Sequence, residues 1–179
     1  MPFPTFASGD VLNASDMNAV GLWLVKTQTI GSGASSVVVT SAFSASYDNY
    51  LITISGGTAS ANGSASLQLN NSTGTTYSAV GTYGNFNVNS GVTYNPAAAT
   101  RWTDALVIGT STYQAHIYLS SPFASRPTTG WTDSASNASY YKFSLLDTST
   151  NSSTGFTITP VTGGVTFTGG TVRVYGYRN

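Results

Sequence analysis

Few side chains in this sequence could take part in acid, base or nucleophilic chemistry. The one histidine, His116, lies in "TYQAHIYLS", where alternation places it beside Gln114 and Tyr118 on one face of a predicted strand. Nucleophilic hydrolysis needs a base next to the nucleophile, and no serine lies in a G-x-S-x-G turn. A histidine between Gln and Tyr on a strand face is typical of a hydrogen-bonding surface or interface residue. We therefore predict that His116 belongs to an interface.

The acidic residues are six aspartates, and glutamate is absent. Two carboxylates roughly 5–10 Å apart would suffice for glycoside hydrolysis, but each aspartate also fits a turn, a helix start or a strand end. The segment "DTSTN" at 147–151 has little in common with a calcium loop, and the lack of cysteine excludes thiolate metal sites. The sequence therefore predicts no catalytic, metal or cofactor-binding residues and no enzyme. A small depolymerase domain remains an alternative.

Two tryptophans have the chemistry of a sugar-stacking or interface residue. Trp102 follows Arg101, and Trp131 lies in "SRPTTGWTD", so both are surrounded by residues that are common in turns. An exposed indole ring there could stack on a sugar or anchor a protein contact. The alternative is that each ring closes one end of the core. Trp102 and Trp131 are thus the candidate glycan contacts of a carbohydrate-binding module.

The elements that position these residues are predicted to be strands. Only 7% of the residues are charged, against roughly 25% in an ordinary soluble domain. Without glutamate and with two lysines, the chain has little material for the wet face of an amphipathic helix. Hydrophobic residues make up 40% and aromatic residues 12%, which is enough apolar surface for a folded core. Gly, Ser, Thr and Asn supply the turns of an all-β fold.

We expect an antiparallel, jelly-roll-like β-sandwich in residues 22–179, preceded by an N-terminal arm, residues 1–21, with a helical turn at about 14–20. Residues 71–100 are either one or two short strands or a long surface loop. The predicted strands are 22–30, 35–40, 48–55, 64–70, 104–110, 112–120, 139–147, 154–159 and 170–178.

The last predicted strand has two different faces. Val172, Val174 and Gly176 alternate with Arg173, Tyr175 and Tyr177, so the first set is expected to face the core and the second set to lie outside. A β protein with few charges has little protection for its edges and outer faces, which predicts a closed homo-oligomer. The predicted oligomer interface consists of His116, Tyr118, Arg173, Tyr175 and Tyr177.

Charge and hydropathy also bear on partners. The net charge is zero and the six basic residues are scattered, so we expect no nucleic-acid binding. The longest apolar run, "AVGLWLV" at 19–25, is far shorter than a membrane span, and "MPFPTFASGD" lacks a basic leader. We therefore expect that the protein is synthesised in a cytoplasm and does not insert into a membrane.

Three stretches together resemble small virion accessory proteins of tailed bacteriophages, namely tail-fibre, head-fibre and capsid-decoration proteins. The opening segment is similar to their "G-x-V-L-T-A-x-D-x-N" start, with Gly9, Asp16 and Asn18 in place and Asn13 where threonine is usual. The others are "FSASYDNYLITISGG" at 43–57 and "GGTVRVYGYRN" at 169–179. Residues 58–168 share mainly a Gly-, Ser- and Thr-rich strand rhythm.

This resemblance implies a non-enzymatic virion component, synthesised in a bacterial host. Its arm would dock on capsid or tail proteins, and its β domain would face outward, commonly as a trimer. A short fibre or receptor-binding module and a capsid decoration, or cement, protein are the two forms it suggests, and a host surface glycan is a further candidate partner. The apolar residues expected to dock the arm are Phe3, Phe6, Val11, Leu12 and Met17.

Overall fold

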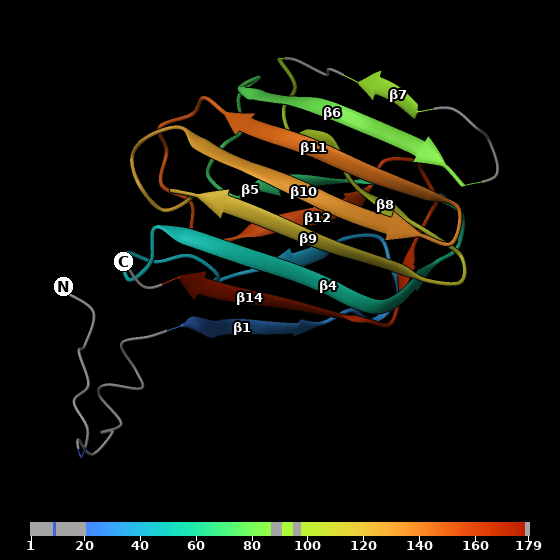
Figure 1. Ribbon diagram of the computed structural model, residues 1–179, viewed down its shortest axis with the longest axis horizontal. Coiled ribbons are helices and arrows are strands. Elements are labelled where there is room, and N and C mark those ends of the chain that lie inside the picture. The colour runs from blue at the N-terminus through green and yellow to red at the C-terminus, as the bar shows by residue number, and fades with distance from the viewer. Residues whose placement is uncertain (1–8, 10–20, 87–90, 95–97, 178–179) are drawn as a thin grey trace.

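The computed structural model describes residues 9, 21–86, 91–94 and 98–177, and these form two packed antiparallel β-sheets (Figure 1). The predicted all-β sandwich is confirmed. The expected helical turn at 14–20 and the five proposed docking residues of the arm lie outside the described residues. The strands are β1 (Leu22–Thr29), β2 (Ser32–Ala34), β3 (Val37–Val39), β4 (Asn49–Ala59), β5 (Gly63–Leu69), β6 (Tyr77–Asn85), β7 (Gly91–Tyr94), β8 (Trp102–Ile108), β9 (Tyr113–Ser120), β10 (Thr128–Ser136), β11 (Ser139–Asp147), β12 (Phe156–Pro160), β13 (Phe167–Thr168) and β14 (Thr171–Tyr177).

Eight of these strands have the connectivity of a jelly roll. They form four nested antiparallel pairs, β1 with β14, β3 with β12, β4 with β9 and β5 with β8. Successive pairs alternate between the two sheets, giving the orders β1-β14-β4-β9 and β3-β12-β5-β8. This is the arrangement obtained when one long hairpin wraps around a core, so the jelly-roll prediction is confirmed by topology.

Two inserted hairpins widen one sheet. The strands β6 and β7 follow β5, and β10 and β11 follow β9, and all four join the larger sheet beyond β9 in the order β10-β11-β6-β7. The smaller sheet lies behind the larger one in Figure 1. Apart from these hairpins, the short strand β13 pairs with β2 and with the end of β4. The larger sheet therefore carries a broad outer face.

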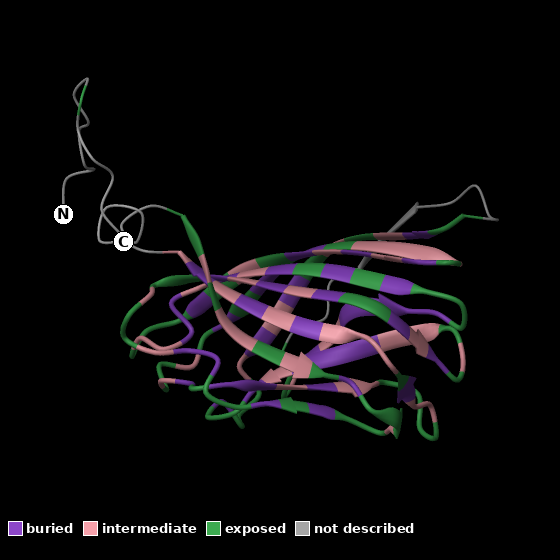
Figure 2. Cartoon of the chain, turned by 90° about the horizontal axis from the view of Figure 1, so that it is seen from below, coloured by how far each residue is buried: buried purple, intermediate pink, exposed green. Residues whose placement is uncertain are grey.

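The core lies between the sheets and follows the predicted alternation, and buried and exposed positions alternate along the strands in Figure 2. Tyr50, Ile52 and Ile54 on β4 are at most 2% exposed, and Val172 and Val174 on β14 are fully buried. Gly176 also faces inward, as expected. A Cβ there would lie 2.4 Å from Cγ of Tyr47, so only glycine leaves room for that ring. Larger aromatic rings bridge the layers, with Phe43 stacked on Phe156 at 5.7 Å between centroids.

The sequence analysis did not predict β10. Residues 71–100, where short strands were one of two alternatives, contain the strands β6 and β7. The side chains of β10 that point into the sandwich are Thr128, Thr132, Ser134 and Ser136, all buried. Because they are small and polar, β10 lacks the hydrophobic alternation by which strands are recognised. Ser134 Oγ instead accepts a hydrogen bond from the backbone N–H of Val107 on β8.

Two buried tyrosines provide a matched test of this core. The Tyr77 hydroxyl donates to the carbonyl oxygen of Ser72 at 3.1 Å and accepts from the N–H of Leu69 at 3.0 Å. The Tyr113 hydroxyl has no hydrogen-bond partner among the described residues. We expect Tyr77→Phe to lower the free energy of unfolding by about 1–3 kcal/mol, since it leaves two backbone groups unpaired. Tyr113→Phe should be neutral or stabilising, as urea denaturation of both variants would show.

The same pair predicts how stability changes at alkaline pH. Burial raises the pKa of Tyr77 to about 12 and that of Tyr113 to about 12. The folded state holds these two protons more tightly than the unfolded chain does. The contribution of the two tyrosines to the free energy of unfolding is therefore fully present below about pH 10 and is lost as pH rises through about 12. Tyr113→Phe should remove part of this alkaline loss. A flat stability profile between pH 9 and 12, values bracketing the ordinary tyrosine pKa, would contradict the assigned burial.

Candidate functional site

One row of side chains crosses the outer face of the larger sheet and is largely apolar. Paired residues on neighbouring strands share a face, and successive pairings run from Leu24 on β1 to Val80 on β6. We call its six apolar or aromatic members the outer band: Leu24, Tyr175, Leu51, Tyr118, Trp131 and Val80. Leu24 is 56% exposed, Val80 50% and Trp131 46%. The wet face of an antiparallel sheet is normally polar, so this band is an interaction-surface candidate.

A polar row runs beside the outer band on the same face. It consists of Thr27, Arg173, Thr53, His116, Asp133, Lys142 and Thr82, one residue from each of seven strands. Within the described chain, its one ion pair joins Lys142 Nζ to Asp133 Oδ2 at 3.3 Å. Arg173 Nη1 donates to Ser55 Oγ at 3.5 Å, and no carboxylate in the described residues pairs with it. The surface thus combines an apolar strip with hydrogen-bonding groups.

The structure brings the five predicted interface residues together. Tyr118 and Tyr175 lie in the outer band, His116 and Arg173 lie in the polar row, and Tyr177 lies on the same face at the end of β14. All belong to β9 or β14, which flank β4. The prediction from alternation was therefore sufficient to find residues that share a surface, although it did not identify what contacts them.

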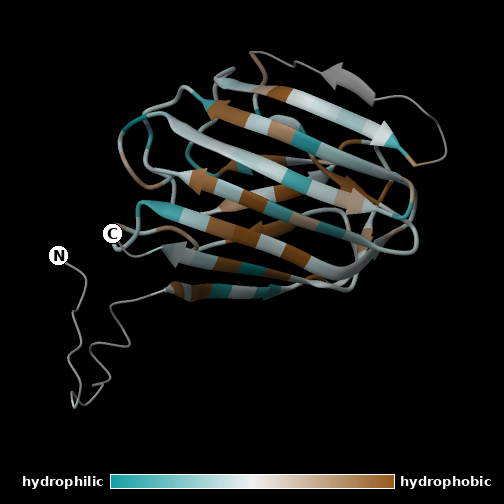
Figure 3. Ribbon diagram, in the orientation of Figure 1, coloured by the Kyte–Doolittle hydropathy of each residue, from teal (hydrophilic) through white to brown (hydrophobic). Residues whose placement is uncertain are grey.

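Sequence reasoning missed several apolar members of this surface. Leu51 occupies an outward position on β4, and Leu22 and Leu24 begin β1, whose first part is brown in Figure 3. Val80 was missed because no strand was assigned to β6. A detectable signal existed in β1, where "LWLV" is apolar on both faces of an edge strand.

The two candidate glycan contacts have different environments. Trp102 is 1% exposed, and its indole Nε1 donates to the carbonyl oxygen of Leu146 at 3.0 Å. Its ring packs edge-on against Tyr77, with 5.0 Å between centroids. A glycan contact at Trp102 is therefore wrong, because the ring is sealed between the sheets. The second interpretation of Trp102, as a residue of the core, is the one that the structure supports.

Trp131, in contrast, lies on the outer face, on a strand and not in a turn. Its indole ring stacks on the ring of Tyr118 from the neighbouring strand, with centroids 3.9 Å apart and planes 17° from parallel. Burial raises the pKa of Tyr177, and interaction with the nearby Tyr118 adds to this shift. The three rings therefore form one aromatic group.

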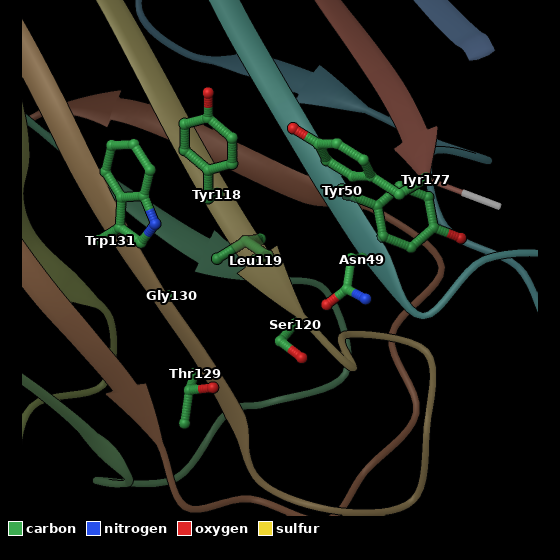
Figure 4. Close-up of a pocket in the computed structure, with 9 residues that line it drawn as sticks. All are labelled: Asn49, Tyr50, Tyr118, Leu119, Ser120, Thr129, Gly130, Trp131 and Tyr177. Atoms are coloured by element: carbon green, nitrogen blue, oxygen red, sulfur yellow. The ribbon is translucent and has the colours of Figure 1, made fainter. Parts of the chain in front are cut away.

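A hollow of about 480 Å³ opens beside this aromatic group (Figure 4). Tyr177 lies on one side of it and the Trp131–Tyr118 stack on the other. The hollow exists because the outward side chains next to the outer band on β4, β9 and β10 are short. They are Asn49, Ser120 and Thr129, which are paired across these three strands. These side chains offer amide and hydroxyl groups at the edge of an apolar depression.

In comparisons with known proteins, no family model, no curated protein and no solved structure matches the chain. Among the described residues, no group of three or more His, Asp or Glu side chains is arranged to hold a metal ion, and no helix is long and apolar enough to cross a membrane. What the outer face offers is stacking, hydrogen bonding and apolar contact.

Proposed function

We propose that this chain is a non-enzymatic structural accessory protein of a tailed-bacteriophage virion. Its jelly roll faces outward and associates with identical copies into a trimer, and its residues 1–21 dock on the particle. The observation that carries the proposal is the outer band, a largely apolar row on a face that water would otherwise cover. The resemblance of both ends of the chain to virion accessory proteins supports the same role.

The proposed occupant of one end of the band, the end at β1, is a second copy of this chain. The contact centres on Leu24, Tyr175 and Leu51, which lie at the β1 end of the band, next to the sheet edge. With a net charge of zero and few charged residues, identical faces can approach without electrostatic repulsion. Arg173 beside this patch is available to pair with a carbonyl or an aspartate of a neighbour. Burying the patch in a trimer removes its apolar surface from water.

Introducing charges into the patch tests the proposal. We expect the wild-type chain at micromolar concentration to have three times the chain mass in light scattering, and Leu24→Lys combined with Leu51→Lys to be monomeric, because two charges would be buried without partners. Val38→Lys is the matched control, since Val38 is 57% exposed on β3 of the other sheet. A monomeric wild type, or a trimer that survives the double substitution, would reject the proposed contact.

The location of the protein on the particle distinguishes two forms of this function. The resemblance of residues 9–18 favours a short fibre or receptor-binding module, whereas the compact jelly roll without a shaft repeat favours a capsid decoration protein. Deleting residues 2–12 should leave the oligomer intact and abolish incorporation into particles. Density for the protein in a map of the virion would assign it to the tail or to the head.

A further inference from the structure

A second, smaller hollow lies on the other side of Trp131. Its volume is about 280 Å³, and its outward-facing lining consists of Trp131, Val80, Thr82, Asp133, Lys142 and Ser144. It is located over β6, β10 and β11, the inserted hairpins, away from the β1 end of the outer band. We propose that this hollow binds a neutral pyranose sugar, with the free face of the Trp131 indole as its stacking platform.

The free face follows from the geometry of the aromatic stack. Trp131 and Tyr118 are directly paired on β10 and β9, and their nearly parallel rings face each other across these strands. One face of the indole is therefore covered by Tyr118, and the opposite face is directed toward β11. The residue paired with Trp131 on β11 is Ser144, which is exposed and too short to cover the ring. The 46% exposure of Trp131 agrees with an open second face.

The chemistry of the hollow fits a sugar ring. One side of a pyranose presents C–H groups, which are attracted to the electron-rich face of an indole. Its hydroxyl groups need both donors and acceptors. Lys142 supplies a donor, Asp133 an acceptor, and Ser144 and Thr82 supply hydroxyls that serve as either, all at the edge of the indole.

Charge and size restrict the ligand further. Lys142 and Asp133 pair at 3.3 Å, so the hollow has no net charge to attract an anion or a cation. Pockets for drug-sized ligands span roughly 300–1,000 Å³, so a hollow of about 280 Å³ suits a single ring. Few contacts can be made there, and a dissociation constant of about 1–10 mM is expected for one monosaccharide. An array of copies would raise the avidity for a polysaccharide surface.

The inference is independent of the proposed trimer, because the sugar hollow and the self-association patch occupy opposite ends of the outer face. The probes are methyl glycosides of glucose, galactose and mannose and N-acetylglucosamine, each titrated into the full chain labelled with ¹⁵N at tryptophan. We expect at least one of these sugars to shift the indole N–H resonance of Trp131, while that of the buried Trp102 stays in place. Trp131→Phe identifies the resonance.

Filling the hollow tests its position without touching the core. Ser144→Tyr places a ring against the free indole face and should weaken binding at least tenfold. Val38→Tyr, at an exposed position of β3 in the other sheet, should leave binding unchanged. Trp131→Ala should remove binding, measured on uniformly ¹⁵N-labelled chain by the chemical shifts of the backbone amides around Ser144. The mass in solution, measured on the same samples, should stay constant.

Two outcomes would overturn the inference. The first is that none of the four sugars perturbs the Trp131 resonance at about a hundredfold the expected millimolar constant or at the solubility limit. The second is binding that persists in Ser144→Tyr, which would place the ligand in the larger hollow next to Tyr177. Loss of sugar binding together with loss of the trimer in Ser144→Tyr would equally contradict it, because the two surfaces would then not be separate.

Discussion

Deletion of residues 171–179 is expected to prevent folding altogether. β14 lies between β1 and β4 in the larger sheet and pairs with both of them along its length. Its inward side chains Val172 and Val174 are fully buried in the core. Removing the strand leaves the backbone groups of β4 and β1 unpaired and opens the core to water, at a cost that exceeds the total stability of about 5–15 kcal/mol. The deletion variant should accumulate in the insoluble fraction and lack a cooperative thermal transition.

Two point substitutions test separately the inward and the outward face of β14. Val174→Asp places a carboxylate in the core and should lower the free energy of unfolding by at least about 3 kcal/mol. Arg173→Thr changes the adjacent, outward position and should shift it by no more than about 0.5 kcal/mol. Equal effects of the two substitutions would contradict the assigned faces of β14. Soluble, cooperatively folded protein from the deletion variant would contradict the structural role of the strand.

Replacing Trp102 by alanine is expected to have the next largest effect on stability. The ring fills space between β8 and β11, packs against Tyr77, and ties the sheets together through the hydrogen bond to the carbonyl oxygen of Leu146. Deleting a buried aromatic side chain typically costs about 3–5 kcal/mol. Trp131→Ala removes the same atoms from the outer face, and we expect a loss of about 1 kcal/mol from the stack with Tyr118.

Chemical denaturation of the two variants gives the comparison directly. Trp102→Phe is a useful third variant, because it keeps a buried aromatic ring but loses the hydrogen bond and part of the packed volume, and we expect a loss between about 1 kcal/mol and that of Trp102→Ala. If Trp102→Ala and Trp131→Ala were equally stable, the assignment of one tryptophan to the core and the other to the surface would be untenable.

The local alternation of the chain was enough to predict most strands and their faces. β11 was predicted with its observed bounds, 139–147, and Val172, Val174 and Gly176 were placed on the core side. These predictions succeed because a strand with one buried face must alternate apolar and polar residues, whatever its neighbours are. β10 was missed because its inward residues are small and polar. In residues 71–100 strands were one of two alternatives, because the inward residues of β6 include a glycine and do not form an apolar alternation.

The sequence by itself determined the all-β class, the antiparallel sandwich and the residues of β9 and β14 that share an outer face, because these depend on composition and on a period of two. Only the tertiary structure decided the roles of the tryptophans. Trp102 and Trp131 have similar neighbours in the chain, but the pairing of β8 and β10 in different sheets buries one ring and exposes the other. The outer band is likewise a product of register, since its members come from six strands, most of them distant from one another in sequence.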